Sequence, residues 1–121
     1  MEEFRVIIAG SRNFQDFELL EAKMDFFLSQ VKSEKKIVIV CGKAKGADIL
    51  GERYGRKNGY EVREFPALWD TEGKSAGYRR NVRMAENADA LVAFWDGKSR
   101  GTEHMISIAA KKNMKTRIVR Y

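Results

Sequence analysis

Short apolar segments alternate along this chain with stretches of helical periodicity, and this alternation restricts the fold more than any other feature. Five segments have the short length, and most have the β-branched composition, of buried strands. The third of them mixes apolar and polar side chains, so we expect it near an edge of the sheet. The five expected strands are residues 5–9, 37–41, 60–65, 90–95 and 116–119.

Apolar residues recur every three or four positions between these strands, which is typical of amphipathic helices. The clearest repeat covers residues 17–31, with Asp16 placed as its N-cap. A second helix begins at Ala47 and ends before Asn58-Gly59. A third is expected around residues 78–88, where Tyr78, Val82, Ala85 and Ala88 form its apolar face. A fourth runs from the turn ending at residue 102 to about residue 112. Residues 66–76 form the one long loop.

The resulting order is β-α-β-α-β-α-β-α-β. Buried strands that alternate with helices predict a parallel sheet covered on both faces, joined by right-handed crossovers. The sequence therefore predicts an α/β fold, a three-layer Rossmann-like domain with a mostly parallel five-stranded sheet. A chain of 121 residues without an internal repeat or linker suits one domain, residues 1–121.

Composition excludes several classes of protein. The single cysteine, Cys41, and the single histidine, His104, leave no disulfide framework and no Cys- or His-based zinc site, so we expect no metal and no cofactor. The longest apolar runs are far shorter than a membrane span, and the N-terminus has no basic and apolar signal region. We expect a cytoplasmic protein without a membrane partner.

Positive charge is unevenly distributed along the chain. The net charge is +6, but residues 1–31 carry −3 and residues 32–121 carry +9. Much of the excess falls in the turns that follow the strands. In a parallel α/β sheet those turns gather at the carboxyl ends of the strands, where ligands bind at the point at which strand order reverses.

Each of these turns also opens a helix, whose free backbone N–H groups attract anions. Asp16 and Glu18 would repel an anion at the first helix, so we expect phosphate groups nearer residues 42–46 and 99–102, with the first turn beside them. None of the turns reads G-x-G-x-x-G or G-x-x-x-x-G-K-[ST], which argues against a dinucleotide dehydrogenase and a P-loop enzyme.

Four motifs occur in order along nearly the whole chain. They are V-I-I-A-G-S-R-N-F at residues 6–14, G-x-A-x-G-A-D at 42–48, G-K-S-A-G-x-x-R-N-x-x-M at 73–84, and A-D-A-L-V-A-F-W-D-G-x-S-x-G-T at 88–102. Together they resemble the YspA/YpsA-related family of the SLOG superfamily of Rossmann-like domains. That resemblance implies a nucleotide-binding domain that takes a nucleotide or nucleotide-derived ligand across the strand ends. The same superfamily also contains the LOG-type phosphoribohydrolases and the Smf/DprA DNA-processing proteins.

The turns and the resemblance together select the candidate ligand-binding residues. We expect a nucleotide or nucleotide-derived phosphate ligand at the C-terminal edge of the sheet, held by Gly10, Ser11, Arg12, Gly42, Lys43, Ala44, Gly46, Asp48, Lys74, Arg80, Asn81, Asp96, Ser99, Gly101 and Thr102. A base could stack on Trp69, Tyr78 or Trp95, which lie in or beside the loops. Core packing at the strand end suits Trp95 better, and Trp69 is the better candidate for a lid. Lys43 stands where the family usually has a second glycine.

A comparison with the LOG-type enzymes leaves catalysis open. Arg80 and Met84 fall on the Arg and Met of their R-K-x-x-M helix, and Gly101 and Thr102 match their P-G-G-x-G-T turn. At the position of their catalytic Glu this chain has His104, and Glu103 is one place away, which on a helix is a rotation of about 100°.

Three functions therefore remain. The first is binding, with sensing or processing, of a nucleotide-derived small molecule. The second is LOG-like cleavage of an N-glycosidic bond, for which Glu103, Asp96 and Asp48 are the carboxylates near the turns. The third is DprA-like nucleic-acid binding, which the basic segment permits although no recognition helix is evident. Relatives also suggest a homodimer, to which the four-residue spacing of Gly51 and Gly55 could contribute, although helix-on-sheet packing explains that spacing equally well.

Overall fold

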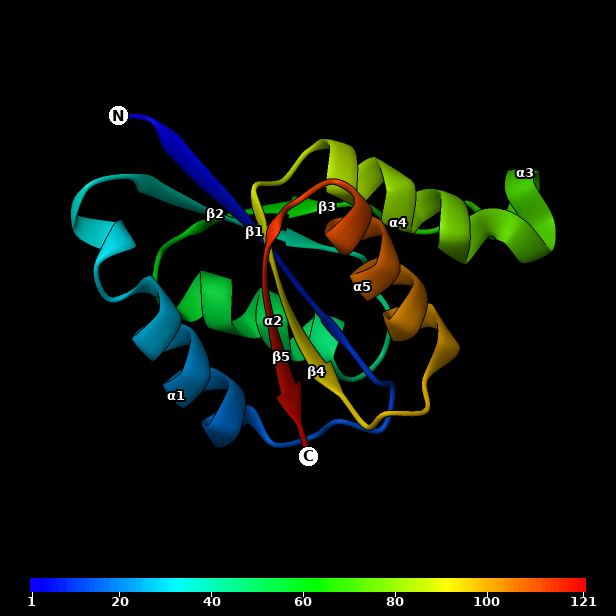
Figure 1. Cartoon of the computed structure of the whole chain (residues 1–121), viewed down its shortest axis with the longest axis horizontal. Coiled ribbons are helices and arrows are strands. Elements are labelled where there is room, and N and C mark those ends of the chain that lie inside the picture. Colours follow the sequence, from blue (N-terminus) through cyan, green and yellow to red (C-terminus); the bar gives the residue numbers. More distant parts are fainter.

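The computed structural model describes residues 1–121 and contains one five-stranded sheet with helices on both faces (Figure 1). All neighbouring strands are parallel, in the order β3-β2-β1-β4-β5. The strands are β1 (Glu3–Gly10), β2 (Lys36–Cys41), β3 (Glu61–Glu64), β4 (Ala90–Trp95) and β5 (Lys115–Arg120). The helices are α1 (Phe17–Leu28), α2 (Ala47–Lys57), α3 (Trp69–Glu72), α4 (Ala76–Glu86) and α5 (Arg100–Lys111), with short 3-10 turns η1 (Val31–Ser33) and η2 (Gly73–Ser75).

Two apolar layers hold the helices to the sheet. Because successive side chains of a strand point to opposite faces, β1 supplies both layers: Val6 and Ile8 contact one, Ile7 and Ala9 the other. Helices α1 and α2 complete the first layer, and α4 and α5 complete the second. The central strand is therefore buried from both sides, as its unbroken apolar sequence predicts.

The chain reverses direction across the sheet at β1. From β1 it proceeds outward to β2 and β3 on one side, and it then returns to β4 and β5 on the other. The carboxyl ends of β1 and β4 thus lie side by side at the switch point, with α1 and α2 on one face and α4 and α5 on the other (Figure 1). In folds of this type a crevice opens at that point.

The predicted α/β architecture is confirmed, and the sheet is wholly rather than mostly parallel. β3 lies at an edge, and the Asp16 side chain accepts a hydrogen bond from the Leu19 amide as the N-cap of α1. The long loop is more ordered than predicted, since it contains α3 and η2. None of the helices is both long and apolar enough to cross a bilayer.

The predicted apolar face of the third helix is correct only in part. Ala85 is buried and Ala88 packs against the core as predicted, but Tyr78 and Val82 are exposed, and Asn81 and Met84 are buried instead. The helix is rotated so that Asn81 meets polar groups of α5, and these contacts come from a distant part of the chain that periodicity alone does not reveal.

Candidate functional site

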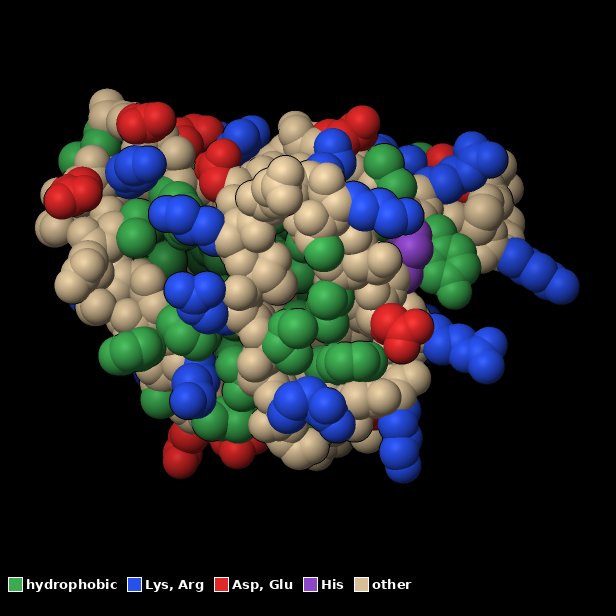
Figure 2. All heavy atoms as spheres, viewed as in Figure 1, with side chains coloured by type: hydrophobic (Ala, Val, Ile, Leu, Met, Phe, Trp, Pro, Cys, Tyr) green, Lys and Arg blue, Asp and Glu red, His purple; other side chains and the backbone are tan.

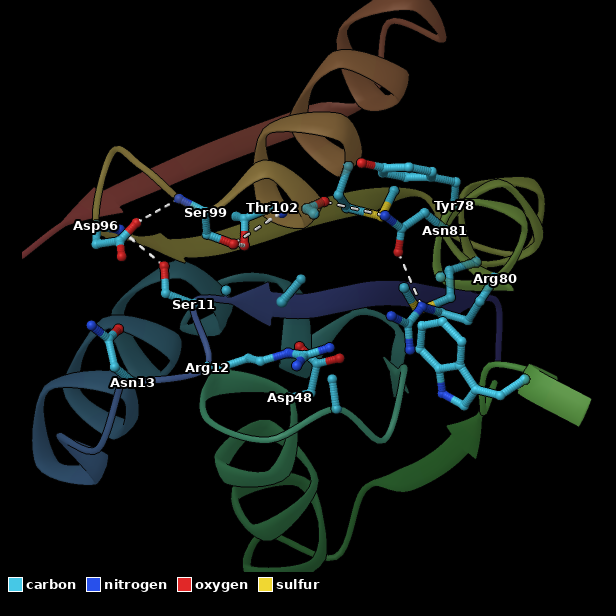
Figure 3. Close-up of a pocket in the computed structure, with 18 of the residues that line it drawn as sticks. Ser11, Arg12, Asn13, Asp48, Tyr78, Arg80, Asn81, Asp96, Ser99 and Thr102 are labelled. Atoms are coloured by element: carbon cyan, nitrogen blue, oxygen red, sulfur yellow. Dashed lines mark hydrogen bonds between the residues drawn. The ribbon is translucent and has the colours of Figure 1, made fainter. Parts of the chain in front are cut away.

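A cavity of about 530 Å³ lies at the carboxyl ends of β1 and β4 (Figure 3). Its wall comes from the turn after β1, the turn before α2, the α3–α4 region and the β4–α5 turn. These segments meet only because the switch point brings the strand ends together. The lining residues are Ala9, Gly10, Ser11, Arg12, Asn13, Ala44, Asp48, Trp69, Lys74, Gly77, Tyr78, Arg80, Asn81, Met84, Asp96, Ser99, Gly101, Thr102 and Met105.

Ser11 and Asp96 join the two central strand ends. The buried Ser11 hydroxyl accepts a hydrogen bond from the Asp96 amide (3.1 Å), and the Ser11 amide donates to the Phe94 carbonyl (3.0 Å). The Asp96 carboxylate in turn accepts from the amides of Ser99 (2.9 Å) and Lys98 (2.8 Å). These amide donors hold the pKa of Asp96 below its usual value. Its carboxylate therefore shapes the β4–α5 turn.

That turn sets the start of α5 against the cavity. Ser99 is the N-cap: its hydroxyl accepts from the Thr102 amide (3.5 Å) and lies 3.1 Å from the Thr102 hydroxyl. Gly101 also lines the cavity. A Cβ added to Gly101 would have no atom within 4 Å. The first turn of α5 thus presents backbone N–H groups beside an open space, an arrangement that attracts anions.

Arg80 crosses from α4 to the turn before α2. Its Nη1 donates to the Gly42 carbonyl, and its Nε donates to Asn81 Oδ1 (3.1 Å). Burial lowers the pKa of the Arg80 guanidinium, and the charge of Asp48 acts in the opposite direction. An anion entering the cavity would restore some of the solvation that this cation has lost.

Asp48, in the first turn of α2, is the buried carboxylate of the wall, with only 4% of its surface exposed. Burial raises the pKa of Asp48 to about 6, against the charge of Arg80 and the amides of Ala44 and Gly42. Its protonation therefore changes within a mildly acidic range, which makes the charge of the cavity dependent on pH.

Asn81 joins α4 to α5. Its amide nitrogen donates to the Gly101 carbonyl (3.2 Å) and lies 3.1 Å from His104 Nδ1. Because an amide nitrogen only donates, His104 Nδ1 accepts and the ring proton sits on Nε2. Burial and Lys111 lower the pKa of His104, which favours this neutral ring. His104 does not line the cavity itself and supports the wall through its contact with Asn81.

Twelve of the fifteen predicted site residues line the cavity. Among them Arg12, Lys74 and Arg80 are cations without an ion pair to an acidic side chain. The other three predicted residues are not on the wall. Gly42 lies behind Arg80, and Gly46 packs on the Ser11 and Arg12 backbone.

Lys43 is the third residue outside the wall. Its ammonium group pairs with Glu52 (2.8 Å) and Glu64 (3.1 Å), and its backbone has φ 63°. The positive φ explains why a glycine suits this position, and the two ion pairs hold the lysine side chain on α2 and β3.

Seven lining residues are outside the predicted set. Trp69 and Tyr78 are predicted only as stacking candidates, and the sequence positions of the others do not distinguish a cavity wall from a core or a turn. Met84 and Met105, for example, occupy apolar positions of their helices. The full group is Ala9, Asn13, Trp69, Gly77, Tyr78, Met84 and Met105.

Comparison with known proteins agrees with this geometry. The family model for the YspA, cpYpsA-related SLOG family matches residues 4–71, which is more than half of the chain. The chain belongs to this family. A relative of the SLOG domain is the Gene 61 protein of Mycobacterium phage D29, which is 35% identical over 114 residues, 88% of this chain and 89% of the relative.

Three solved structures share the fold of this SLOG domain. DNA processing protein A (DprA) from Streptococcus pneumoniae has a TM-score of 0.71 at 18% identity, and DprA from Helicobacter pylori, which binds single-stranded DNA, has a TM-score of 0.71 at 16%. The SLOG domain is covered to 97% and 95%, but it spans only 50% and 64% of those longer chains. The protein TM1055 has a TM-score of 0.64 at 19% identity, covering 96% of this chain and 72% of its own.

Proposed function

We propose that this SLOG domain binds a nucleotide or a nucleotide-derived phosphate ligand in the cavity at the strand ends. One observation carries the proposal: Arg12, Lys74 and Arg80 line a single cavity, and none of them is paired with an acidic side chain. Lys43, by contrast, lies outside the cavity and is paired with two acidic side chains. Cations gathered around a concave site next to a helix N-terminus suit phosphate.

The dimensions of the cavity favour a small molecule. A volume of about 530 Å³ lies within the range of small-ligand sites. The wall also mixes charged groups with apolar ones, such as Met84 and Met105. Such a wall suits a ligand with a phosphate and a less polar part.

Calorimetric titration with AMP, ADP-ribose and NAD tests the proposal. Arg80→Gln keeps the size and polarity of the side chain but removes its charge, so we expect binding about ten- to a hundredfold weaker. Arg79→Gln is the matched control, because Arg79 is the neighbouring arginine of α4, is exposed and does not line the cavity. Binding of none of the three ligands, or equal losses in the two variants, would contradict the proposal.

Cleavage of an N-glycosidic bond in the same cavity would depend on Asp48. Of the three carboxylates near the turns, Glu103 is exposed and off the wall, and Asp96 holds the β4–α5 turn. Asp48 alone combines a place on the wall with a pKa suited to proton transfer near neutral pH. Chromatography for free base after incubation with nucleoside monophosphates, with Asp48→Asn alongside, decides whether the bound ligand is also a substrate.

Binding of single-stranded nucleic acid is a second candidate, supported by a separate observation. Residues 1–97 contain 16 basic and 16 acidic side chains, whereas residues 98–121 contain seven basic and one acidic. All seven are exposed and none forms an ion pair. Figure 2 shows Lys and Arg side chains over the face on which β5 and α5 lie. We call Lys98, Arg100, Lys111, Lys112, Lys115, Arg117 and Arg120 the basic strip.

Fluorescence anisotropy with a labelled single-stranded oligonucleotide tests this candidate at about 50 and about 200 mM salt, because phosphate contacts weaken steeply with salt. The double variant Lys115→Glu/Arg117→Glu should weaken binding about tenfold or more at low salt. Lys23→Glu/Lys32→Glu makes the same change of charge at exposed, unpaired positions outside the basic strip. Equal affinity of the two double variants would exclude the strip as the nucleic-acid surface.

A further inference from the structure

We propose that Trp69 and Tyr78 form a base-binding end of the cavity, so that the preferred ligand carries an aromatic base as well as a phosphate. This inference rests on the proposed nucleotide function, because it concerns the other half of the same ligand. It narrows the ligand class from nucleotide-derived phosphates in general to those that still contain the nucleobase.

The two aromatic side chains are exposed on the cavity wall. Trp69 is 54% exposed and Tyr78 is 47% exposed. They are also the two aromatic residues of the cavity wall. Aromatic faces left open beside cationic groups offer a stacking surface for a base, and stacking accepts any base because each has a π-face.

The Tyr78 side chain packs against His104. Its ring meets the His104 ring edge-on, with the centroids 4.5 Å apart and the planes at 64°. His104 is fixed by Asn81, which also bonds the start of α5 (Figure 3). The tyrosine ring is therefore positioned before a ligand arrives, which lowers the entropy that binding must remove.

Trp69 lies against the start of α4. A methyl group on Gly77 would be 3.6 Å from Cη2 of the indole, so the ring borders the first turn of that helix. Lys74 lies between the two aromatic residues in the chain, and Arg80 follows Tyr78 by two positions; both cations line the cavity. A base at the aromatic side would thus place an attached phosphate beside these cations.

The comparison of AMP with ribose 5-phosphate isolates the base. We expect the wild-type protein to bind AMP about tenfold or more tightly than ribose 5-phosphate, as stacking of one base supplies such factors. In calorimetric titrations, Trp69→Ala and Tyr78→Ala should each lower the affinity for AMP about tenfold. The same substitutions should change the affinity for ribose 5-phosphate less than about threefold. Trp69→Phe, which keeps a ring, should retain most of the AMP affinity.

Val82→Ala is the matched control, since Val82 is an exposed apolar residue of α4 outside the cavity. Fluorescence gives an independent readout: AMP should quench the emission of the wild type, and the quenching should disappear in Trp69→Ala, which still contains Trp95. Melting curves of each variant confirm that the fold is kept.

Two results would overturn the inference while leaving the nucleotide site intact. One is equal affinity for AMP and ribose 5-phosphate. The other is a preference for AMP that survives both alanine substitutions. If neither ligand binds at all, the proposed function fails together with this inference, so the two failures are distinguishable.

Discussion

Arg80 reaches the cavity through space that Gly42 leaves free. A Cβ at residue 42 would lie 2.5 Å from Arg80 Nη1 and 2.8 Å from Asp48 Oδ2. The absence of a side chain at residue 42 therefore lets the Arg80 guanidinium and the Asp48 carboxylate both lie against the same turn. Gly42 is the first residue of the motif at 42–48, so the position of Arg80 depends on a glycine that is distant from it in the sequence.

Asp48 should make the stability of the fold depend on pH. The pKa of Asp48 is about 6 in the folded chain and 3.8 when unperturbed, so the native state binds the proton more tightly. This contribution is fully present below pH 3.8 and is lost as pH rises through 6. Asp48→Asn removes the dependence, and the free energy of unfolding of the variant minus that of the wild type should rise by about 2 kcal/mol between pH 4 and 7.

Urea unfolding at several pH values measures this difference. The subtraction cancels the carboxylates and histidine that both proteins share. A difference that stays constant across the range would show that Asp48 is already ionised in mild acid, as in the unfolded chain.

At the scale of elements, α2 depends on a close approach to the sheet. A Cβ on Gly51 would lie 2.7 Å from the Cβ of Ile8, and one on Gly55 would lie 2.8 Å from Ile39 Cγ1. The four-residue spacing of these glycines therefore serves packing within the domain. The two glycines let α2 pack close to β1 and β2. This close packing fixes where the N-terminus of α2 lies at the cavity.

Gly51→Ala should lower the free energy of unfolding by about 1–3 kcal/mol, because the added methyl group must push the helix from the sheet. Gly101→Ala is the matched control, as it is also helical but has no atom within 4 Å of the new methyl group. Thermal or chemical unfolding gives both values. A Gly51→Ala protein as stable as the Gly101→Ala protein would mean that α2 can move outward at little cost.

Much of this arrangement of elements could be predicted from local sequence. The apolar runs of β1, β2 and β4 place these strands to within a few residues, and Asp16 marks the start of α1. The glycine-containing turns also indicated which loops would meet at the strand ends, because parallel strands bring those ends to one edge.

The directions of individual side chains could not be predicted in this way. Asn81 is buried because partners 20 and 23 positions away, Gly101 and His104, lie against it. Lys43 turns from the cavity because α2 and β3 supply Glu52 and Glu64. Such choices depend on contacts between elements, whereas periodicity describes one element at a time.

At the scale of the whole molecule, the cavity follows from topology. β1 is the first strand in the chain and the middle strand of the sheet, so the connections must leave it in both directions. The β4–α5 turn is thereby brought beside the turn after β1, and its Asp96 amide bonds Ser11 across 85 positions of sequence. A site built from four separate segments needs the complete fold.

The basic strip makes the charge distribution of the molecule asymmetric. Its first 97 residues carry no net charge, so the whole excess lies along one side, on α5, β5 and the turn between β4 and α5. In the field of an anion, a dipolar body rotates before contact and presents its positive side. Lys98 and Arg100 alternate in the chain with the lining residues Ser99 and Gly101. The side that turns toward an approaching anion is therefore the side on which this wall of the cavity is built.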